Sequence, residues 1–197
     1  MFDFSTSYKK FVIEIGSGDG RLLNNLVDLY DKKSVCFIGT EIDKVQYFNA
    51  CTLAENSNNK NIKFINEPFE KVFSNLNDNS VDTVISVLPH PDYIDKVHQD
   101  KWIPIYKTVL NKIKDNGYFI LVTEITDELL EPISESQYSD WKKWLVQTFS
   151  SIGFRIYRSI DEGAPLCFSS HYLDTFKRDH LRIKILNVLT NHLKKYL

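Results

Sequence analysis

Short, almost wholly apolar runs alternate along this chain with segments of helical periodicity, and this alternation restricts the fold more than any other feature. Such runs are typical of buried strands in a parallel sheet, with the helices between them covering both of its faces. The sequence therefore predicts an α/β fold with a seven-stranded, mostly parallel sheet. The expected strands lie at residues 11–15, 35–38, 62–65, 81–88, 118–122, 154–157 and 166–168.

Apolar spacing and end signals place the expected helices. One helix is predicted after the second strand, with Val45, Phe48 and Leu53 on one face. Another is predicted to end at the turn-forming residues 115–117, Asp-Asn-Gly, just before the fifth strand. From about Lys177 onward, the apolar spacing predicts an amphipathic helix that packs on the core.

The composition is that of a globular protein, with 43% hydrophobic and 25% charged residues. A length of 197 residues predicts a single domain spanning residues 1–197. No apolar run approaches the roughly 20 residues needed to cross a bilayer, and the first residues lack the pattern of a signal peptide. Cys36, Cys51 and Cys167 form neither a zinc motif nor a redox pair, which favours reduced thiols, no bound metal and a cytoplasmic location.

Charge is nearly balanced overall but unevenly distributed. The formal net charge is −2, so no global field attracts the protein to nucleic acid. Residues 124–140 contain six acidic residues and no lysine or arginine, whereas residues 142–197 contain ten basic and four acidic residues. The basic part is compatible with an anionic partner and equally with a solvated helix face.

A glycine-rich turn, Glu14-Ile15-Gly16-Ser17-Gly18-Asp19-Gly20, joins the first strand to the first helix. Glycines allow the chain to turn sharply and let a ligand approach the backbone. The spacing is G-x-G-x-G, whereas dinucleotide sites that bind a pyrophosphate have G-x-G-x-x-G, so a ligand without a pyrophosphate is favoured. Glu41 ends the second strand, where its carboxylate can accept both hydroxyls of an adenosine ribose.

This combination resembles class I S-adenosylmethionine-dependent methyltransferases. Besides the turn and Glu41, Asn116-Gly117-Tyr118 and Ile152-Gly153-Phe154 match that family in order. The resemblance implies a Rossmann-like fold with S-adenosylmethionine as cofactor, its methionine part on the glycine turn, its ribose on Glu41 and its adenine near residues 66–68. The residues that it places around the cofactor are Glu14, Gly16, Ser17, Gly18, Glu41, Ile42, Asn66, Glu67 and Leu88.

The segment after the fourth strand, Leu88-Pro89-His90-Pro91-Asp92-Tyr93, bears on the methyl acceptor. It lacks the N-P-P-Y type of motif that is used for exocyclic amines and glutamine amides. It is similar to the P-D-P-W stretch of tRNA (guanine-N7)-methyltransferases, with His90 in place of the family's Asp and Asp92 in place of its Trp. The resemblance implies a tRNA substrate, catalysis at His90, and substrate contacts from four residues: Asp92, Glu124, Ser170 and Tyr172.

The possible chemistry of His90 depends on its protonation. Ring nitrogen seven of guanine carries a lone pair and no proton, so its methylation needs positioning and exclusion of water more than a base. A protonated imidazole would repel the sulfonium, so His90 must be neutral to act there. A neutral imidazole would also serve as a base for an acceptor that loses a proton. A turn histidine without a catalytic role remains an alternative.

Three functions remain open. The first is methylation of RNA, with tRNA guanine as the leading substrate and phosphate contacts from Lys177, Arg178 and Arg182. The second is methylation of a small molecule or a protein, which the nearly balanced charge fits. The third is a catalytically silent cofactor-binding subunit whose activity belongs to a partner. No oligomeric state is predicted.

Overall fold

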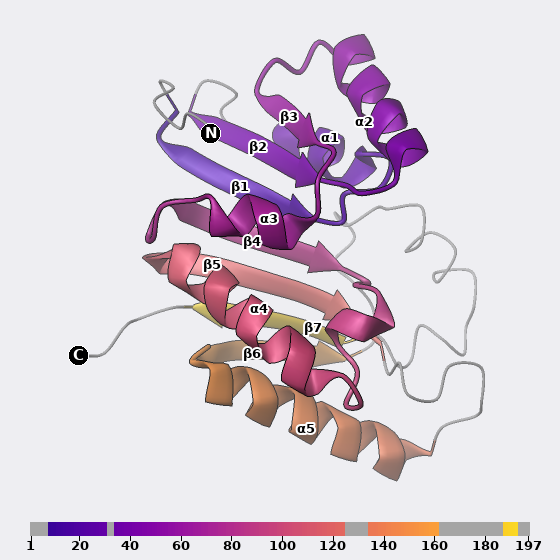
Figure 1. Cartoon of the computed structure of the whole chain (residues 1–197), viewed down its shortest axis with the longest axis vertical. Helices are drawn as coiled ribbons and strands as arrows, with labels where there is room; N and C mark the ends of the chain where they lie inside the picture. The colour runs from indigo at the N-terminus through magenta and orange to yellow at the C-terminus, as the bar shows by residue number, and fades with distance from the viewer. Residues whose placement is uncertain (1–7, 31–33, 125–133, 162–186, 193–197) are drawn as a thin grey trace.

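The computed structural model of this chain describes residues 8–30, 34–124, 134–161 and 187–192. Seven strands form one sheet in the order β3-β2-β1-β4-β5-β7-β6 (Figure 1). The strands are β1 Lys10–Ile15, β2 Val35–Thr40, β3 Ile62–Ile65, β4 Val81–Val87, β5 Ile113–Thr123, β6 Ile156–Asp161 and β7 Asn187–His192. Strands β1 to β5 pair in parallel, whereas β7 is antiparallel to both β5 and β6. Parallel pairing therefore joins five strands and does not extend over all seven.

Helices cover both faces of the sheet. They are α1 Arg21–Val27, α2 Lys44–Asn56, α3 Phe69–Ser74, α4 Gln99–Lys112 and α5 Glu135–Ile152, with a short 3-10 helix η1 at Pro91–Tyr93. In Figure 1, α3, α4 and α5 lie in front of the sheet and α1 lies behind it. The buried residues divide accordingly into two clusters, one under α3 to α5 and one under α1 and α2.

An aromatic cluster fixes α4 and α5 to β5. The Phe149 ring of α5 lies 5.1 Å from Tyr106 and 5.9 Å from Trp102, both on α4, measured between ring centroids. It also stacks on Phe119 of β5 at 5.8 Å. All four side chains are fully buried. Because large aromatic rings bury much apolar surface in fixed geometries, this cluster holds the start of α4, and with it the loop after β4, in place.

Two local predictions are corrected by the structure. Val45 and Phe48 of α2 are 67% and 64% exposed, and the helix instead buries the small residues Ala50 and Ala54. Helix α4 ends at Lys112, and residues 115–117 lie within β5. A Cβ at Gly117 would lie 2.8 Å from the carbonyl oxygen of Asp82, so this glycine permits the close approach of β5 to β4.

The predicted helix from about Lys177 is wrong at its centre. Residues 187–192 form strand β7, in which Leu189 pairs with Leu121 of β5. The strand expected at residues 166–168 lies outside the described residues. None of the helices that the structure describes combines the length and the apolar composition needed to cross a membrane.

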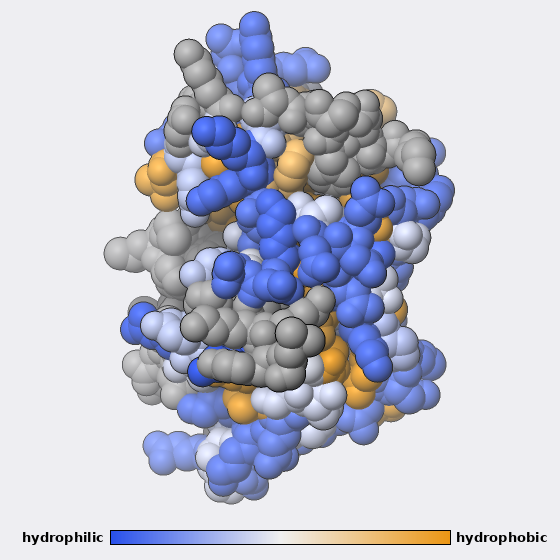
Figure 2. Space-filling view, turned by 90° about the vertical axis from the view of Figure 1, so that its left-hand side faces the viewer, coloured by the Kyte–Doolittle hydropathy of each residue, from blue (hydrophilic) through white to orange (hydrophobic). Residues whose placement is uncertain are grey.

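The parallel strands all point toward one edge of the sheet. Figure 2 shows the opposite side of the molecule, where these strands begin, and that side is mostly hydrophilic. Ion pairs lie there between Lys112 and Asp78 at 2.7 Å and between Lys114 and Asp82 at 2.8 Å. Open α/β sheets bind ligands at the carboxyl ends of their strands, so the candidate site lies at the other edge.

Candidate functional site

The glycine turn between β1 and α1 has a strongly constrained backbone. Gly16, Gly18 and Gly20 have φ values of 66°, 52° and 77°, which lie in the left-handed region that side chains disfavour. A Cβ at Gly16 or Gly18 would meet no atom within 4 Å, whereas a Cβ at Gly20 would lie 2.6 Å from the Phe64 ring and 2.8 Å from Ala50. Gly20 therefore serves packing, and the other two glycines leave open space above the turn.

Glu41, just after β2, joins the glycine turn to the start of α2. Its Oε2 accepts a hydrogen bond from the Gly18 N–H at 2.7 Å, and its Oε1 accepts one from the Asp43 N–H at 2.8 Å. Asp43 caps α2 by accepting a hydrogen bond from the Gln46 N–H. The half-buried Glu41 carboxylate thus fixes two segments from neighbouring strands at one edge of the sheet.

Several of the predicted cofactor residues lie in the segments next to Glu41. The Asn66 side-chain amide donates to the backbone oxygens of Glu41 at 2.8 Å and Ile42 at 3.2 Å. The Ser17 N–H donates to the Thr40 carbonyl at 2.9 Å. The Ile42 side chain is 69% exposed. These contacts bring the glycine turn, residues 41–43 and Asn66 together.

Glu67 differs from its neighbour Asn66. Its Oε1 lies 2.8 Å from the Lys71 Nζ in an ion pair one helical turn apart. This contact directs the carboxylate along α3, and no contact described for Glu67 joins it to Glu41 or to the glycine turn. The structure therefore does not bring this predicted residue into the hydrogen-bonded group around Glu41.

Glu14 is the most unusual ionisable residue of the site. Its side chain on β1 is 1% exposed, and its Oε2 has no hydrogen-bond partner among the described residues. Burial raises the pKa of this carboxyl well above its usual value, and the negative charges of Asp19 and Glu41 raise the pKa further. A buried carboxyl group therefore lies within electrostatic range of Glu41 and of Asp19 on the turn.

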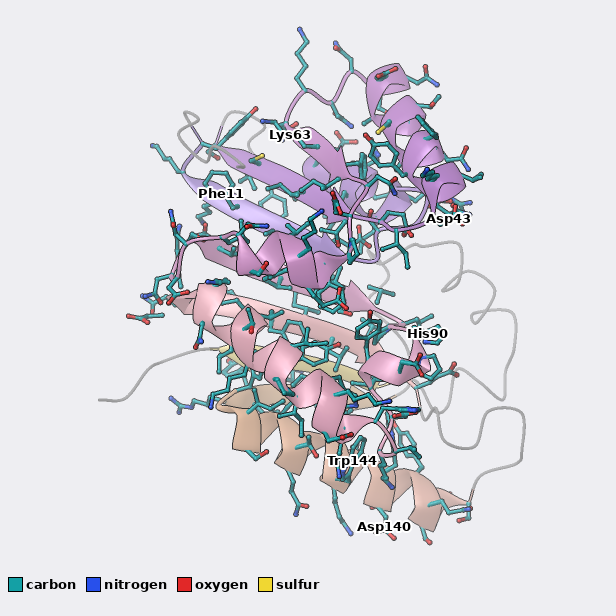
Figure 3. The ribbon with its side chains drawn as sticks, viewed as in Figure 1. Phe11, Asp43, Lys63, His90, Asp140 and Trp144 are labelled. Carbon is teal, nitrogen blue, oxygen red and sulfur yellow. The ribbon has the colours of Figure 1, made fainter. Side chains whose placement is uncertain are left out.

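The loop after β4 begins with a strained residue. Leu88 has a φ of 50°, which is uncommon for a residue with a side chain, and its N–H donates to the Val122 carbonyl at 2.7 Å. His90 follows with a side chain that is 69% exposed, and its Nδ1 lies 3.3 Å from the Asp92 N–H nitrogen and 3.5 Å from the Asp92 carboxylate. Figure 3 shows His90 and Asp43 at the same edge of the sheet.

Three potential metal ligands meet near this loop. The ligand atoms of Asp92, Asp95 and His98 all lie within 4.8 Å of one another. Asp95 is already bound within the chain, because its carboxylate lies 2.8 Å from the His98 Nδ1 and its carbonyl accepts a hydrogen bond from the Trp102 Nε1. Through these contacts, the Asp95–His98 pair anchors the loop to α4.

Sequence reasoning missed a polar contact under the same loop. The Tyr93 hydroxyl donates to the Glu70 Oε1 of α3 at 2.6 Å, which raises the pKa of Tyr93 to about 12, with burial as a further cause. The nearby hydroxyl of Tyr106 is fully buried, and burial raises its pKa as well. Glu70 and Tyr93 are 23 positions apart in sequence, so no local pattern would predict the pairing.

For the remaining predicted site residues, the structure describes few contacts or does not describe the residue. Glu124 is buried at the end of β5, where its backbone oxygen accepts a hydrogen bond from the Thr123 hydroxyl. Ser170 and Tyr172 lie outside the described residues. So do the predicted phosphate contacts, Lys177, Arg178 and Arg182.

Comparisons with known proteins agree with this fold. Residues 7–163 match a family model described as a methyltransferase domain. No curated protein sequence matches the chain. One similar solved structure is the 16S rRNA methyltransferase KamB, with a TM-score of 0.72, 13% identity, and coverage of 96% of this chain and 90% of that one.

Two further solved structures have the same fold. A SAM-dependent methyltransferase from Aquifex aeolicus has a TM-score of 0.63 and 14% identity, over 96% of this chain and 85% of that one. The 30S ribosomal A1408 methyltransferase from an uncultured bacterium has a TM-score of 0.60 and 18% identity, over 95% and 89% of the two chains.

Proposed function

Because this chain belongs to the family of methyltransferase domains, we propose that it binds S-adenosylmethionine at the glycine turn and transfers its methyl group to RNA. The observation on which the proposal mainly rests is the Glu41 carboxylate, which is bound to the Gly18 N–H beside open backbone. The ligand supplies an electrophilic methyl group on a positively charged sulfur. The residues of this chain bind and orient it and exclude water.

The residues at the turn fit this ligand. Both Glu41 oxygens already accept backbone N–H groups, but a carboxylate has about four lone-pair sites, so two ribose hydroxyls can still donate to it. The open space above Gly16 and Gly18 suits the methionine part. Exposed Ile42, held next to Glu41 by Asn66, offers apolar surface to the adenine ring.

The charge of the pocket supports a cationic ligand. Asp19 and Glu41 each act electrostatically on Glu14 near the turn, and the Arg21 guanidinium is paired with Asp19 at 2.8 Å. The acidic groups near the turn favour the sulfonium and ammonium groups of S-adenosylmethionine, and the Glu41 carboxylate repels the pyrophosphate of a dinucleotide. We therefore expect no binding of NAD.

The methyl acceptor is inferred from the loop after β4. Pro89 to Tyr93 follows the central strand at the edge where the glycine turn lies, so it borders the space next to the expected methyl group. The ribosomal RNA methyltransferases with a similar fold favour an RNA base as acceptor. Guanine at ring nitrogen seven of tRNA is our leading candidate, because the loop resembles that of tRNA (guanine-N7)-methyltransferases.

Calorimetry with three ligands tests the cofactor. We expect S-adenosylmethionine and S-adenosylhomocysteine to bind and NAD not to bind. Glu41→Ala should weaken binding by about 1.5–3 kcal/mol through loss of charge-assisted hydrogen bonds. Exposed Glu55, on the outer part of α2, provides a matched control as Glu55→Gln. Tight NAD binding without a response to the other two ligands would contradict the proposal.

Methyl transfer to RNA can be measured directly. The protein is incubated with labelled S-adenosylmethionine and total RNA, with and without ribonuclease, and the labelled nucleosides are separated by chromatography. We expect the label in 7-methylguanosine from the tRNA fraction. Ribonuclease treatment should release this label from the RNA. Label in a methylated adenosine of ribosomal RNA would show that ribosomal RNA, and not tRNA, is the substrate. Label only in protein or small molecules would contradict an RNA acceptor.

His90 is the proposed catalytic residue of this loop, and its variants separate two roles. If it positions guanine as a neutral imidazole, His90→Ala should lower turnover with little change in cofactor affinity, and His90→Asp should preserve activity. If it acts as a base, His90→Asp should be damaging. Equal activity of the wild type and both variants would show that this exposed histidine has no catalytic role.

A further inference from the structure

Among the residues that the structure describes, no cation pairs with the Glu14 carboxylate. Its register neighbours, Gly39 on β2 and Ile85 on β4, are uncharged. The Thr40 hydroxyl donates to the Glu14 backbone oxygen at 3.2 Å and not to its carboxylate. An ionised carboxylate that is buried without a partner is very costly, so such groups take up a proton instead.

The charged groups around Glu14 act in the same direction. Within the described part of the chain, Asp19 on the glycine turn and Glu41 after β2 act on it, and both oppose a third negative charge. The nearby cation, Arg21, is bound to the Asp19 carboxylate at 2.8 Å. Burial, the missing hydrogen bond and the two acidic neighbours therefore all favour the neutral acid in the ligand-free pocket.

We propose that Glu14 is protonated in the ligand-free protein and releases this proton when the ammonium group of S-adenosylmethionine binds. This inference rests on the proposed function. On binding, the O–H bond of the carboxyl breaks, the proton passes to the solvent, and the ligand's positive charge compensates the carboxylate. Glu14 thus determines specificity, because a ligand without a cationic group offers nothing to replace the proton.

Calorimetry in several buffers counts the released protons. S-adenosylmethionine is titrated at one pH into the protein in buffers of different ionisation enthalpy, and the slope of observed against buffer enthalpy gives the protons exchanged. We expect release of about one proton per ligand by the wild type and by Glu55→Gln, and none by Glu14→Gln. Affinity should rise up to tenfold per pH unit while Glu14 remains protonated in the free protein.

Infrared difference spectra give a second readout that does not require the variant to bind. The carboxyl band of a protonated acid should be present in the free wild type, absent from free Glu14→Gln, and lost from the wild type when ligand binds. Tight binding with no proton release would overturn this inference and leave the proposed function intact. Proton release that persists in Glu14→Gln would also overturn it. Failure to bind S-adenosylmethionine at all would instead overturn the proposed function itself.

Discussion

The Glu41 carboxylate and the Gly18 backbone N–H lie 2.7 Å apart, although the two residues are 23 positions apart in sequence. The second oxygen of the same carboxylate binds the Asp43 N–H at 2.8 Å. Glu41 is therefore part of the fold before any ligand binds, because it holds the glycine turn and the first turn of α2 together. A ribose bound there would meet a carboxylate whose position is already fixed.

Replacement of Glu41 should lower stability as well as ligand affinity. Glu41→Ala leaves the Gly18 and Asp43 N–H groups without their acceptor, so we expect a loss of about 1–3 kcal/mol in the free energy of unfolding. Glu41→Gln retains one acceptor oxygen and should lose less. Urea denaturation of the ligand-free proteins measures both changes. Unchanged stability of Glu41→Ala would show that the two hydrogen bonds contribute nothing to the folded state.

Gly18 and Gly20 should respond differently to alanine. Both have a positive φ, so each substitution costs about 1–2 kcal/mol of backbone strain. At Gly20 the added Cβ also overlaps Phe64 and Ala50, so Gly20→Ala should be much the less stable of the two. Gly18→Ala should fold and lose cofactor affinity. Thermal unfolding and calorimetry distinguish the two effects. Equal stability of the variants would contradict the packing role of Gly20.

Glu14→Gln should stabilise the ligand-free protein at neutral pH. Burial raises the pKa of the Glu14 carboxyl in the folded state, whereas in the unfolded chain it titrates near 4.3. The stability that it contributes is complete below pH of about 4.3 and declines as pH rises through the folded-state pKa. Glutamine does not titrate, so the variant should gain stability relative to the wild type across this range. Parallel pH–stability curves for the two proteins would contradict the raised pKa.

Tyr93→Phe should loosen the loop after β4. The variant loses the 2.6 Å hydrogen bond to Glu70, which predicts a loss of about 1.5–3 kcal/mol in the free energy of unfolding. In the wild type this contribution is present below pH of about 10 and declines as pH rises toward about 12, the raised pKa of Tyr93. A double-mutant cycle with Glu70→Gln measures the coupling. Additive effects of the two substitutions would show that the pair does not stabilise the loop.

The parts of the site that could be predicted from sequence are those whose sequence signals are local. The apolar run before Gly16, the turn glycines and the acid at Glu41 each follow from neighbouring residues. Helix α2 was predicted but its face was wrong, because the prediction followed Val45 and Phe48. The contact of α2 with the turn requires Ala50, next to Gly20. Close approach between backbones selects small residues, and hydrophobic spacing does not detect them.

Long-range contacts account for the other errors. The spacing of Val188 and Leu189 fits a helix and a strand equally well, and pairing with Val122 and Leu121 of β5 decides between them. The Glu70–Tyr93 hydrogen bond likewise joins elements that only the folded sheet brings together. The contact between the glycine turn and Glu41 thus joins residues that the sequence had singled out, whereas the polar support of the loop after β4 could not be predicted.

The position of β7 in the sheet affects how the chain folds during synthesis. Within the described sheet, β6 pairs with β7 alone, and β7 separates it from β5. The five parallel strands can pair in turn as they leave the ribosome, but residues 156–161 find no neighbouring strand until residues 187–192 have been synthesised. A chain that stalled between these segments would already contain the glycine turn and Glu41. The edge of β5 that pairs with β7 would, however, be exposed to other nascent chains.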